Sequence, residues 1–250
     1  MLNGKKIEKT RLDTLLMTKG IIPSRKVAQA EIISGNVFVD DKIIDKPGTK
    51  VSEDCEIRLK KTAQDEFVSR GGHKLKSALC SFSIDVKDCV ALDAGASTGG
   101  FTDCLLQMGA KRIYAVDVGY GQLSYKLQVD ERVVVIDRTN IRYMEKDRIP
   151  ELVDLVVIDL SFISLKKVLN NVVNFVKSKG NIVALIKPQF EVGKENVGKG
   201  GIVKDPEEHQ RVIKDITSFC EEINLKVCSV IPSPILGTKG NKEFLIHLIK

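Results

Sequence analysis

The sequence ALDAGASTGGFTDCLL, residues 91–106, gives the first indication of the fold of this chain. It joins the end of an apolar run to Asp93, to a turn with Gly95, Gly99 and Gly100, and then to an amphipathic helical pattern. Glycines in such a turn let the backbone approach a ligand closely. A strand, an acid and a glycine turn that opens a helix are typical of the ligand-binding edge of a doubly wound α/β sheet. A glycine turn alone is often only turn chemistry, so the interpretation depends on the residues further along the chain.

The spacing of the glycines indicates which kind of ligand the turn would hold. The dinucleotide fingerprint G-x-G-x-x-G would need a glycine at Ser97, so a pyrophosphate fits poorly. The next apolar run, Arg112 to Val116, ends in Asp117, which is placed like the acid that receives ribose hydroxyls in doubly wound folds. The two acids favour a nucleoside cofactor without a pyrophosphate, and S-adenosylmethionine has such a ribose.

Strand and helix patterns alternate through the rest of the chain, which predicts an α/β domain with a mostly parallel sheet covered on both faces. The strands are expected near residues 89–93, 112–117, 133–136, 153–159, 180–186, 226–231 and 243–249, and the helices near 73–82, 100–108, 121–127, 164–177 and 206–222. Asp205 is expected to cap the last helix, with Pro206 in its first turn.

Charge appears where two further apolar runs end. LVVI stops at Asp159, and IVALI stops at Lys187. Ligands of open parallel sheets bind outside the carboxyl ends of the strands, so Asp93, Asp117, Asp159 and Lys187 are expected to converge on one crevice. A lysine that is partly desolvated near another cation is suited to deprotonate a hydroxyl. For any one of these residues, a strand-end charge that merely reaches water is the alternative.

The first sixty residues have a different character. Helices are expected over Thr10–Lys19 and, after the cap Ser24, over Arg25–Ser34, followed by short strands near 36–39, 42–44 and 55–59. The second helix is expected to bury four apolar side chains: Val27, Ala30, Ile32 and Ile33. Residues 1–30 hold seven basic and two acidic residues, so this unit could meet phosphates, although a solvated helix face is the commoner fate of such charges.

Composition narrows the classes of protein to which the chain could belong. The 250 residues are 43% hydrophobic with a net charge of +6, enough for one large domain and a small one. The six cysteines form no C-x-x-C pair, which indicates neither a zinc site nor a disulfide framework. No apolar signal core opens the chain and no apolar run approaches the roughly 18 to 20 residues of a membrane span. A cytoplasmic protein with no metal and no membrane association is expected.

The segment RLDTLLMTKGIIPSRKVAQAEIISGNVFVDDKIIDKPGTKV resembles the S-four RNA-binding domain, a small module named after a ribosomal protein, over nearly the whole module. The resemblance implies structured RNA as the ligand. It also implies a contact surface on the two helices, made of Arg11, Ser24, Arg25, Lys26 and Gln29.

A second resemblance rests on four residues that lie far apart: Lys74 in SRGGHKLKSAL, Asp159 in VVIDLSFIS, Lys187 in ALIKPQFE and Glu243 in NKEFLIHL. Their order resembles the lysine, aspartate, lysine, glutamate tetrad of the FtsJ/RrmJ ribose 2′-O-methyltransferases, and DAGASTGGF matches the cofactor turn of that family. The chain as a whole resembles the TlyA family of rRNA 2′-O-methyltransferases, which are often labelled hemolysin A.

This resemblance implies a Rossmann-like S-adenosylmethionine-dependent methyltransferase domain preceded by a small α+β S-four domain. The expected boundaries are 1–60 for the RNA-binding domain, 61–70 for a linker and 71–250 for the methyltransferase domain. The partners are expected to be rRNA or ribosomal subunits, with no obligate protein partner. The residues implied around the cofactor, besides Asp93, are Gly95, Ala96, Ser97, Gly99, Phe101, Asp117, Asp137 and Asp159.

The catalytic roles follow from the tetrad. Lys187 is expected to help remove the 2′-hydroxyl proton with Lys74 nearby, while Asp159 and Glu243 orient the two amines. Asp130 and Glu131 leave the assignment of Asp137 to the adenine open. A loop with glycines at 193, 198, 200 and 201 could close over RNA or be an ordinary surface loop.

Two other functions compete with ribose methylation. The hemolysin label would imply a membrane-active cytolysin, for which the sequence shows neither a spanning segment nor a strongly amphipathic basic helix. S-four modules also precede RNA-modifying enzymes of another chemistry, such as pseudouridine synthases, and the cofactor turn and the tetrad argue against that alternative.

Overall fold

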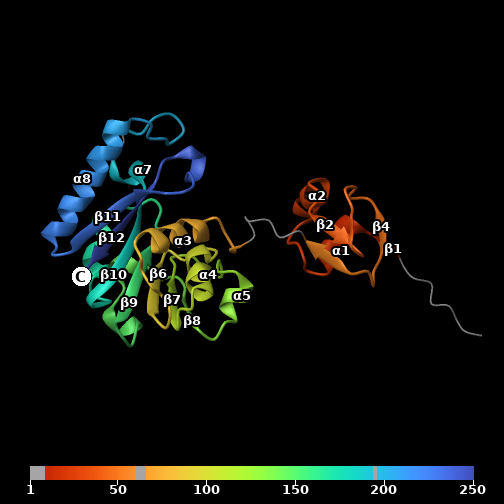
Figure 1. Cartoon of the computed structure of the whole chain (residues 1–250), viewed down its shortest axis with the longest axis horizontal. Coiled ribbons are helices and arrows are strands. Elements are labelled where there is room, and N and C mark those ends of the chain that lie inside the picture. The colour runs from red at the N-terminus through yellow and green to blue at the C-terminus, as the bar shows by residue number, and fades with distance from the viewer. Residues whose placement is uncertain (1–8, 60–65, 194–195) are drawn as a thin grey trace, which may run out of the picture. The chain divides into compact units, whose positions relative to one another are not determined.

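The computed structural model describes residues 9–59, 66–193 and 196–250, and the chain divides into two compact units, Met1–Glu66 and Phe67–Lys250 (Figure 1). Of the expected linker 61–70, residues 61–65 lie outside the described residues. Phe67 is buried in the core of the second unit, and the Val68 amide donates a hydrogen bond to the Asp103 carboxylate. Residues 67–70 therefore belong to the second unit, and the expected linker extends too far.

The first unit packs two helices against short antiparallel strands. In chain order its elements are β1 (Lys9–Arg11), α1 (Leu12–Thr18), α2 (Arg25–Ile33), β2 (Val37–Val39), β3 (Lys42–Ile43), β4 (Lys50–Ser52) and β5 (Ile57–Leu59). Strand β1 pairs with β4, and β2 lies between β3 and β5. Neither β1 nor β4 was expected: β1 overlaps the start of the expected helix Thr10–Lys19, which begins only at Leu12, and its pairing with β4 is a contact between distant segments that no local pattern shows.

Of the four side chains expected to be buried on α2, only Ile32 is buried. Val27 and Ile33 are exposed and Ala30 also faces solvent, whereas Ala28 and Ile32 are buried in the small core. Positions 28 and 32 are four residues apart, the spacing that keeps side chains on one face of a helix. Ser24 caps the helix as expected, since its hydroxyl accepts a hydrogen bond from the Val27 amide.

The second unit is built on a seven-stranded sheet in the order β11-β12-β10-β9-β6-β7-β8. The strands are β6 (Val90–Ala94), β7 (Arg112–Val116), β8 (Val133–Ile136), β9 (Val153–Ile158), β10 (Val176–Ile186), β11 (Lys226–Pro232) and β12 (Phe244–Ile249). Strands β6 to β10 run parallel to one another, while β12 runs antiparallel to both of its neighbours, β10 and β11. The predicted mostly parallel α/β sheet is confirmed.

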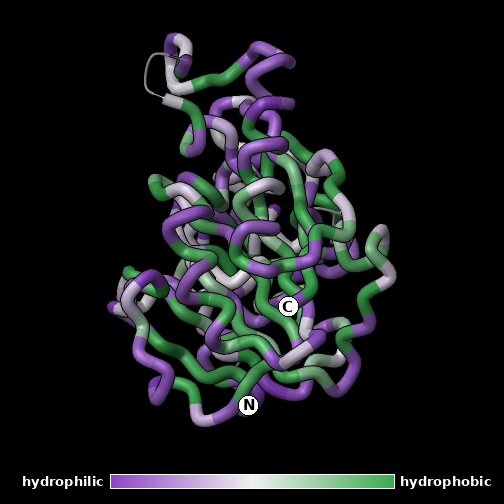
Figure 2. The backbone as a smooth tube through the Cα atoms, turned by 90° about the vertical axis from the view of Figure 1, so that its left-hand side faces the viewer, coloured by the Kyte–Doolittle hydropathy of each residue, from purple (hydrophilic) through white to green (hydrophobic). Residues whose placement is uncertain are grey.

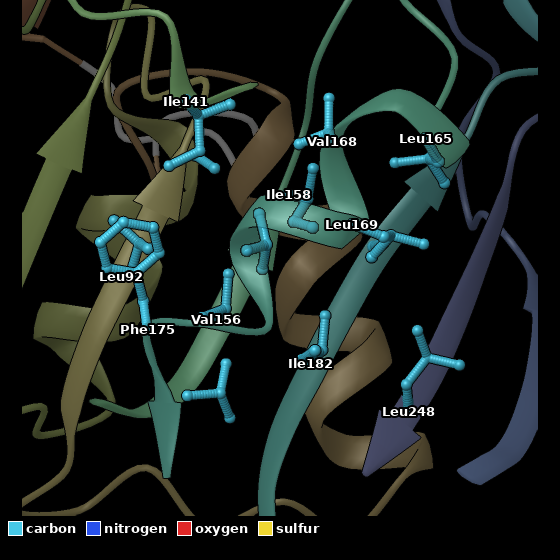
Figure 3. Packing of buried hydrophobic residues seen from close by; sticks show 14 of the residues in the cluster. Leu92, Ile141, Val156, Ile158, Leu165, Val168, Leu169, Phe175, Ile182 and Leu248 are labelled. Carbon is cyan, nitrogen blue, oxygen red and sulfur yellow. The ribbon is translucent and has the colours of Figure 1, made fainter. Parts of the chain in front are cut away.

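Helices cover both faces of this sheet: α3 (Gly71–Ser81), α4 (Gly100–Gln107), α5 (Tyr125–Gln128), α6 (Lys166–Val172), α7 (Pro188–Glu191) and α8 (Pro206–Glu222). On one face, Leu92, Val156 and Ile182 pack against Val168 and Leu169 of α6 (Figure 3). A second cluster joins α3 and α4 to the residues that alternate with these along the strands. Each inner strand is therefore buried on both sides, which explains its continuous Val, Ile and Leu content.

Two helix predictions need correction, while α8 has the bounds predicted for it. The expected helix 164–177 ends at Val172, because β10 begins at Val176, where Val176 pairs with Val153 of β9. The expected helix 121–127 is only the single turn of α5. Tertiary strand pairing decides the first of these differences, and the local pattern does not show it.

Hydrophobic and hydrophilic stretches alternate along the backbone (Figure 2). Among residues 9–59, 66–193 and 196–250, no helix combines the length and the apolar character that crossing a membrane would need.

Candidate functional site

Two adjoining cavities lie at the carboxyl edge of the sheet, and Gly95 and Ser161 border both. The first measures about 290 Å³ and is lined by Ser69, Arg70, Gly71, Lys74, Gly95, Ala96, Ser97, Thr98, Gly100, Phe101, Asp159, Ser161, Lys187 and Gly237. The second measures about 240 Å³ and is lined by Gly95, Val116, Asp117, Val118, Thr139, Asn140, Ile141, Leu160, Ser161, Phe162 and Ile163. Of the four charged residues expected in one crevice, Asp159 and Lys187 line the first cavity, Asp117 lines the second, and Asp93 lines neither.

Gly95 gives the two cavities their shared wall. Its φ is +94°, and a Cβ there would lie 2.5 Å from the backbone oxygen of Asp159. The ends of β6 and β9 can approach this closely only without a side chain at position 95. Gly99 has a different role: its φ is +97°, and a Cβ there would overlap Leu127, so it lets α5 pack against the start of α4 and is not among the cavity residues.

The acids at the strand ends divide into two groups. Asp117 lines the second cavity, where its carboxylate accepts hydrogen bonds from the amides of Ser97 (2.8 Å) and Gly119 (2.7 Å). Asp137 accepts instead from the Gly121 amide at 2.9 Å and lines neither cavity. Thr139, Asn140 and Ile141 line the second cavity in its place, and sequence analysis missed them because they follow the strand end rather than standing at it.

Asp93 is fully buried beneath the glycine turn and also lies outside both cavity walls. One carboxylate oxygen accepts a hydrogen bond from the Thr102 hydroxyl at 2.7 Å, and the other has no hydrogen-bond partner among the described residues. Burial raises the pKa of Asp93 to about 7. Asp93 therefore fixes the start of α4 below the turn rather than facing a ligand.

Replacing Asp93 by asparagine is expected to flatten the pH dependence of stability. An aspartate in an unfolded chain has a pKa of about 3.9. Between that value and about 7 the folded protein binds more protons, so its free energy of unfolding falls as pH rises, by at most about 4 kcal/mol. Asparagine does not titrate and so avoids this loss. The stability of Asp93→Asn relative to the parent should therefore rise from pH 5 to pH 8. Urea unfolding at pH 5 and at pH 8 measures the free energy of unfolding of both proteins. An equal change of this free energy with pH in the variant and the parent would contradict the raised pKa of Asp93.

The four tetrad residues form two ion pairs. Lys187 Nζ lies 2.6 Å from Asp159 Oδ1 and donates a hydrogen bond to Ser161 Oγ at 2.9 Å. Lys74 Nζ lies 2.6 Å from Glu243 Oε2. Both lysines and Asp159 line the first cavity, and a side-chain carbon at Gly237, also in that wall, would overlap the Glu243 carboxylate. Ser161 was missed, although it stands two residues after a strand-end acid.

The antiparallel direction of β12 explains how Glu243 reaches this edge. Ile186, the last residue of β10, pairs with Phe244, the first residue of β12. The start of an antiparallel strand therefore lies at the carboxyl end of its parallel neighbour. Glu243, which precedes β12, and Lys187, which follows β10, therefore lie at the same edge of the sheet.

In the first unit, three of the five expected RNA contacts meet at a residue that sequence analysis missed. Arg11, Arg25 and Gln29 all donate hydrogen bonds to the carboxylate of Asp13, which is fully buried. These bonds hold the pKa of Asp13 well below its usual range, with that from Arg11 contributing most. Ser24 and Lys26 flank the start of α2, and Lys26 is exposed.

The described residues contain no cluster of three or more histidine, cysteine or acidic side chains able to hold a metal ion. The Gly-rich segment has residues 194–195 outside the described part of the chain. Its later residues are attached to the start of β12, because the Asn241 side chain bonds the Val203 amide and the Gly201 carbonyl.

A glycine turn between β6 and α4, an adjoining pair of cavities and two lysine–carboxylate pairs form a site of the kind found at the carboxyl edge of α/β enzymes. The chain belongs to the FtsJ-like methyltransferase family, whose model matches residues 67–250, and the model of the S4 domain matches residues 10–57. Both family resemblances seen in the sequence are thereby confirmed.

Relatives resemble the chain over almost its whole length. YqxC of Bacillus subtilis (strain 168), which carries an rRNA methyltransferase name, is 46% identical over 96% of this chain and 86% of that protein. TlyA of Mycobacterium tuberculosis, named a 16S/23S rRNA (cytidine-2′-O)-methyltransferase, is 44% identical over 96% of this chain and 90% of that protein. A solved structure from Streptococcus thermophilus that carries the hemolysin name superposes with a TM-score of 0.73 at 42% identity, covering 98% of this chain and 89% of that one.

Proposed function

We propose that this protein transfers a methyl group from S-adenosylmethionine to the 2′-hydroxyl of a cytidine in ribosomal RNA. The observation that carries the proposal is the position of the two lysine–carboxylate pairs, at the wall of a cavity that also contains the glycine turn. Its kinship with a named rRNA cytidine-2′-O-methyltransferase supports the choice of substrate. Ribosomal RNA or ribosomal subunits in the cytoplasm are then its partners.

The two cavities fit S-adenosylmethionine in chemistry. Asp117 supplies carboxylate oxygens that can accept the ribose hydroxyls, and the second cavity offers the apolar side chains of Ile141, Leu160 and Ile163 to the adenine. Gly95 and Ser161 border both this cavity and the one with the tetrad, where the methionine portion would lie. The cofactor supplies an electrophilic methyl group on a sulfonium.

The tetrad supplies the remaining chemistry. Asp159 and Ser161 hold Lys187 Nζ at one point of the cavity wall, where the amine, in its deprotonated form, would take the proton that the 2′-hydroxyl loses on methylation. The Lys74–Glu243 pair fixes a second ammonium in the same wall, so that it can orient the ribose. Single-turnover methylation of rRNA that lacks the modification tests the proposal, with nuclease digestion and mass analysis to locate the methyl group.

Replacing Asp117 by alanine should weaken the binding of S-adenosylmethionine by roughly 1.5 to 3 kcal/mol, because charge-assisted hydrogen bonds to the ribose are lost. Calorimetric titration measures the dissociation constant. Asp147→Ala is the matched control, since Asp147 is an exposed carboxylate that lines neither cavity. Equal affinity of Asp117→Ala and the parent would refute the role of Asp117.

The alternatives raised by the sequence lose their support. The hemolysin name is carried by relatives of the same methyltransferase family and is a matter of naming. A pseudouridine synthase needs no methyl donor, and membership of a methyltransferase family argues against it.

A further inference from the structure

The basic surface of the first unit contains a buried negative charge. Asp13, in the first turn of α1, has a side chain with no exposed area, yet it lies between Arg11 and Arg25, whose side chains are about half exposed. A carboxylate close to a phosphate-binding surface lowers the attraction for RNA, and burying a charge costs free energy unless it is fully paired. The position of Asp13 is instead explained if its carboxylate holds the neighbouring side chains in place.

The hydrogen bonds of Asp13 join three parts of the unit. Its Oδ1 accepts from Arg11 Nε at 3.1 Å, and its Oδ2 accepts from Arg11 Nη2 at 3.0 Å, from Arg25 Nε at 3.1 Å and from Gln29 Nε2 at 3.0 Å. Arg11 ends β1, whereas Arg25 and Gln29 lie one turn apart on α2. The Asp13 amide also donates to the Pro47 carbonyl, which ties the residue to the turn before β4.

Asp13 binds the two arginines through different nitrogens, and the Nη groups of Arg25 remain available as hydrogen-bond donors to a ligand. Arg11 is bound through two nitrogens, whereas Arg25 uses only Nε, so that neither of its Nη groups has a hydrogen bond to a described residue. Both guanidinium groups bond to the same oxygen, which keeps the bonded nitrogens within about 6 Å of each other, a separation at which two unpaired cations repel. Asp13 removes this repulsion while the outer nitrogens stay directed away from it.

Gly48 completes the arrangement. A Cβ at this position would lie 3.0 Å from Arg11 Nη1, so the absence of a side chain in the Pro47–Gly48 turn leaves room for the guanidinium. The Arg11 group is thus fixed on one side by Asp13 and bounded on the other by the turn.

We propose that Asp13 is a positioning residue for RNA: it holds Arg11 and Arg25 as a preformed pair that binds neighbouring phosphates of a structured RNA, without touching the RNA itself. This inference rests on the proposed action on rRNA. A preformed pair loses less side-chain entropy on binding than two independent arginines. The buried carboxylate therefore strengthens RNA binding despite its sign.

The direction in which Asp13→Asn changes RNA affinity tests the proposal. Asp13→Asn raises the net charge of the surface by one, so attraction by charge alone would tighten RNA binding and steepen its salt dependence. If Asp13 positions the arginines, the same variant should bind labelled 16S and 23S rRNA transcripts about 10-fold more weakly, with a salt slope lower by about one to two units. Asp54→Asn makes the same charge change at an exposed carboxylate of the same unit and should show no loss.

Two further measurements keep this test decisive. Asp13→Glu retains the charge and should recover part of the affinity, while binding of S-adenosylmethionine should be unchanged in every variant. If Asp13→Asn does not fold, Arg25→Lys serves instead, because the Arg25 side chain is half exposed and lysine keeps its charge. A single ammonium cannot both bond Asp13 and offer phosphate the two parallel donors of a guanidinium, so RNA binding should weaken. Parental affinity of either folded variant would overturn the positioning role. Failure of the parent protein to bind any rRNA would instead overturn the proposed function.

Discussion

Lys187→Ala should lower single-turnover methyl transfer to rRNA by about 10²-fold or more, the scale of losing a positioned proton acceptor. The fold should persist, because the side chain lies at the wall of a cavity and makes polar contacts with Asp159 and Ser161 rather than packing in either core. Asp159 keeps a side chain that is 22% exposed, so water can solvate its carboxylate once the lysine is gone. Cofactor and RNA should bind with nearly parental affinity.

Lys187→Arg distinguishes proton transfer from simple charge. Guanidinium stays protonated at any working pH and cannot take the hydroxyl proton, so this variant should be as slow as Lys187→Ala. Lys214→Ala is the matched control, because Lys214 is an exposed lysine on α8 that lines neither cavity. Parental rates for either Lys187 variant would show that another group removes the proton.

Removing residues 1–66 should abolish measurable methylation of rRNA while leaving the binding of S-adenosylmethionine nearly intact. All the residues that line the two cavities lie in the second unit, whereas the Asp13 cluster lies in the first. Loss of even two or three phosphate contacts lowers RNA affinity by about 10²-fold or more at physiological salt. Calorimetry with the cofactor and methylation of ribosomal subunits measure the two effects separately, and equal methylation by the shortened protein would refute the division of roles.

The position of the cut is itself a test of the boundary. A chain that begins at Gly71 also lacks Phe67 and Ser69, and a Cβ at Gly72 would overlap the Phe67 ring, which shows how closely that ring packs on α3. Ser69 borders the first cavity. This shorter chain should therefore bind the cofactor more weakly than one that begins at Phe67, and equal affinity would place residues 67–70 in the linker after all.

Local patterns were sufficient for much of the sheet and for one edge of the site. The strands β6, β7 and β9 and the helix α8 follow from runs of neighbouring residues, since burial on two faces needs continuous apolar strands and a cap fixes where a helix begins. The convergence of Asp117, Asp159 and Lys187 follows from the parallel direction of their strands, which places every carboxyl end at the same edge.

Local patterns could not show which of these charged residues face the cavities. Asp93, Asp117 and Asp137 each follow an apolar run, yet one is buried under α4, one lines a cavity and one binds a loop amide. A strand end fixes where a residue stands, but packing and turn geometry fix the direction of its side chain.

The two domain types, the glycine turn and the positions of the strand-end charges could therefore be predicted from the sequence alone, because each depends on residues that are close along the chain. The pairing of Lys74 with Glu243, 169 residues away, and the burial of Asp13 between two arginines became visible only in the folded chain. The pairing depends on the antiparallel entry of β12 into the sheet, and the burial depends on α2 closing over the start of α1. Contacts between distant segments form only when the chain has packed, so no periodicity along the sequence records them.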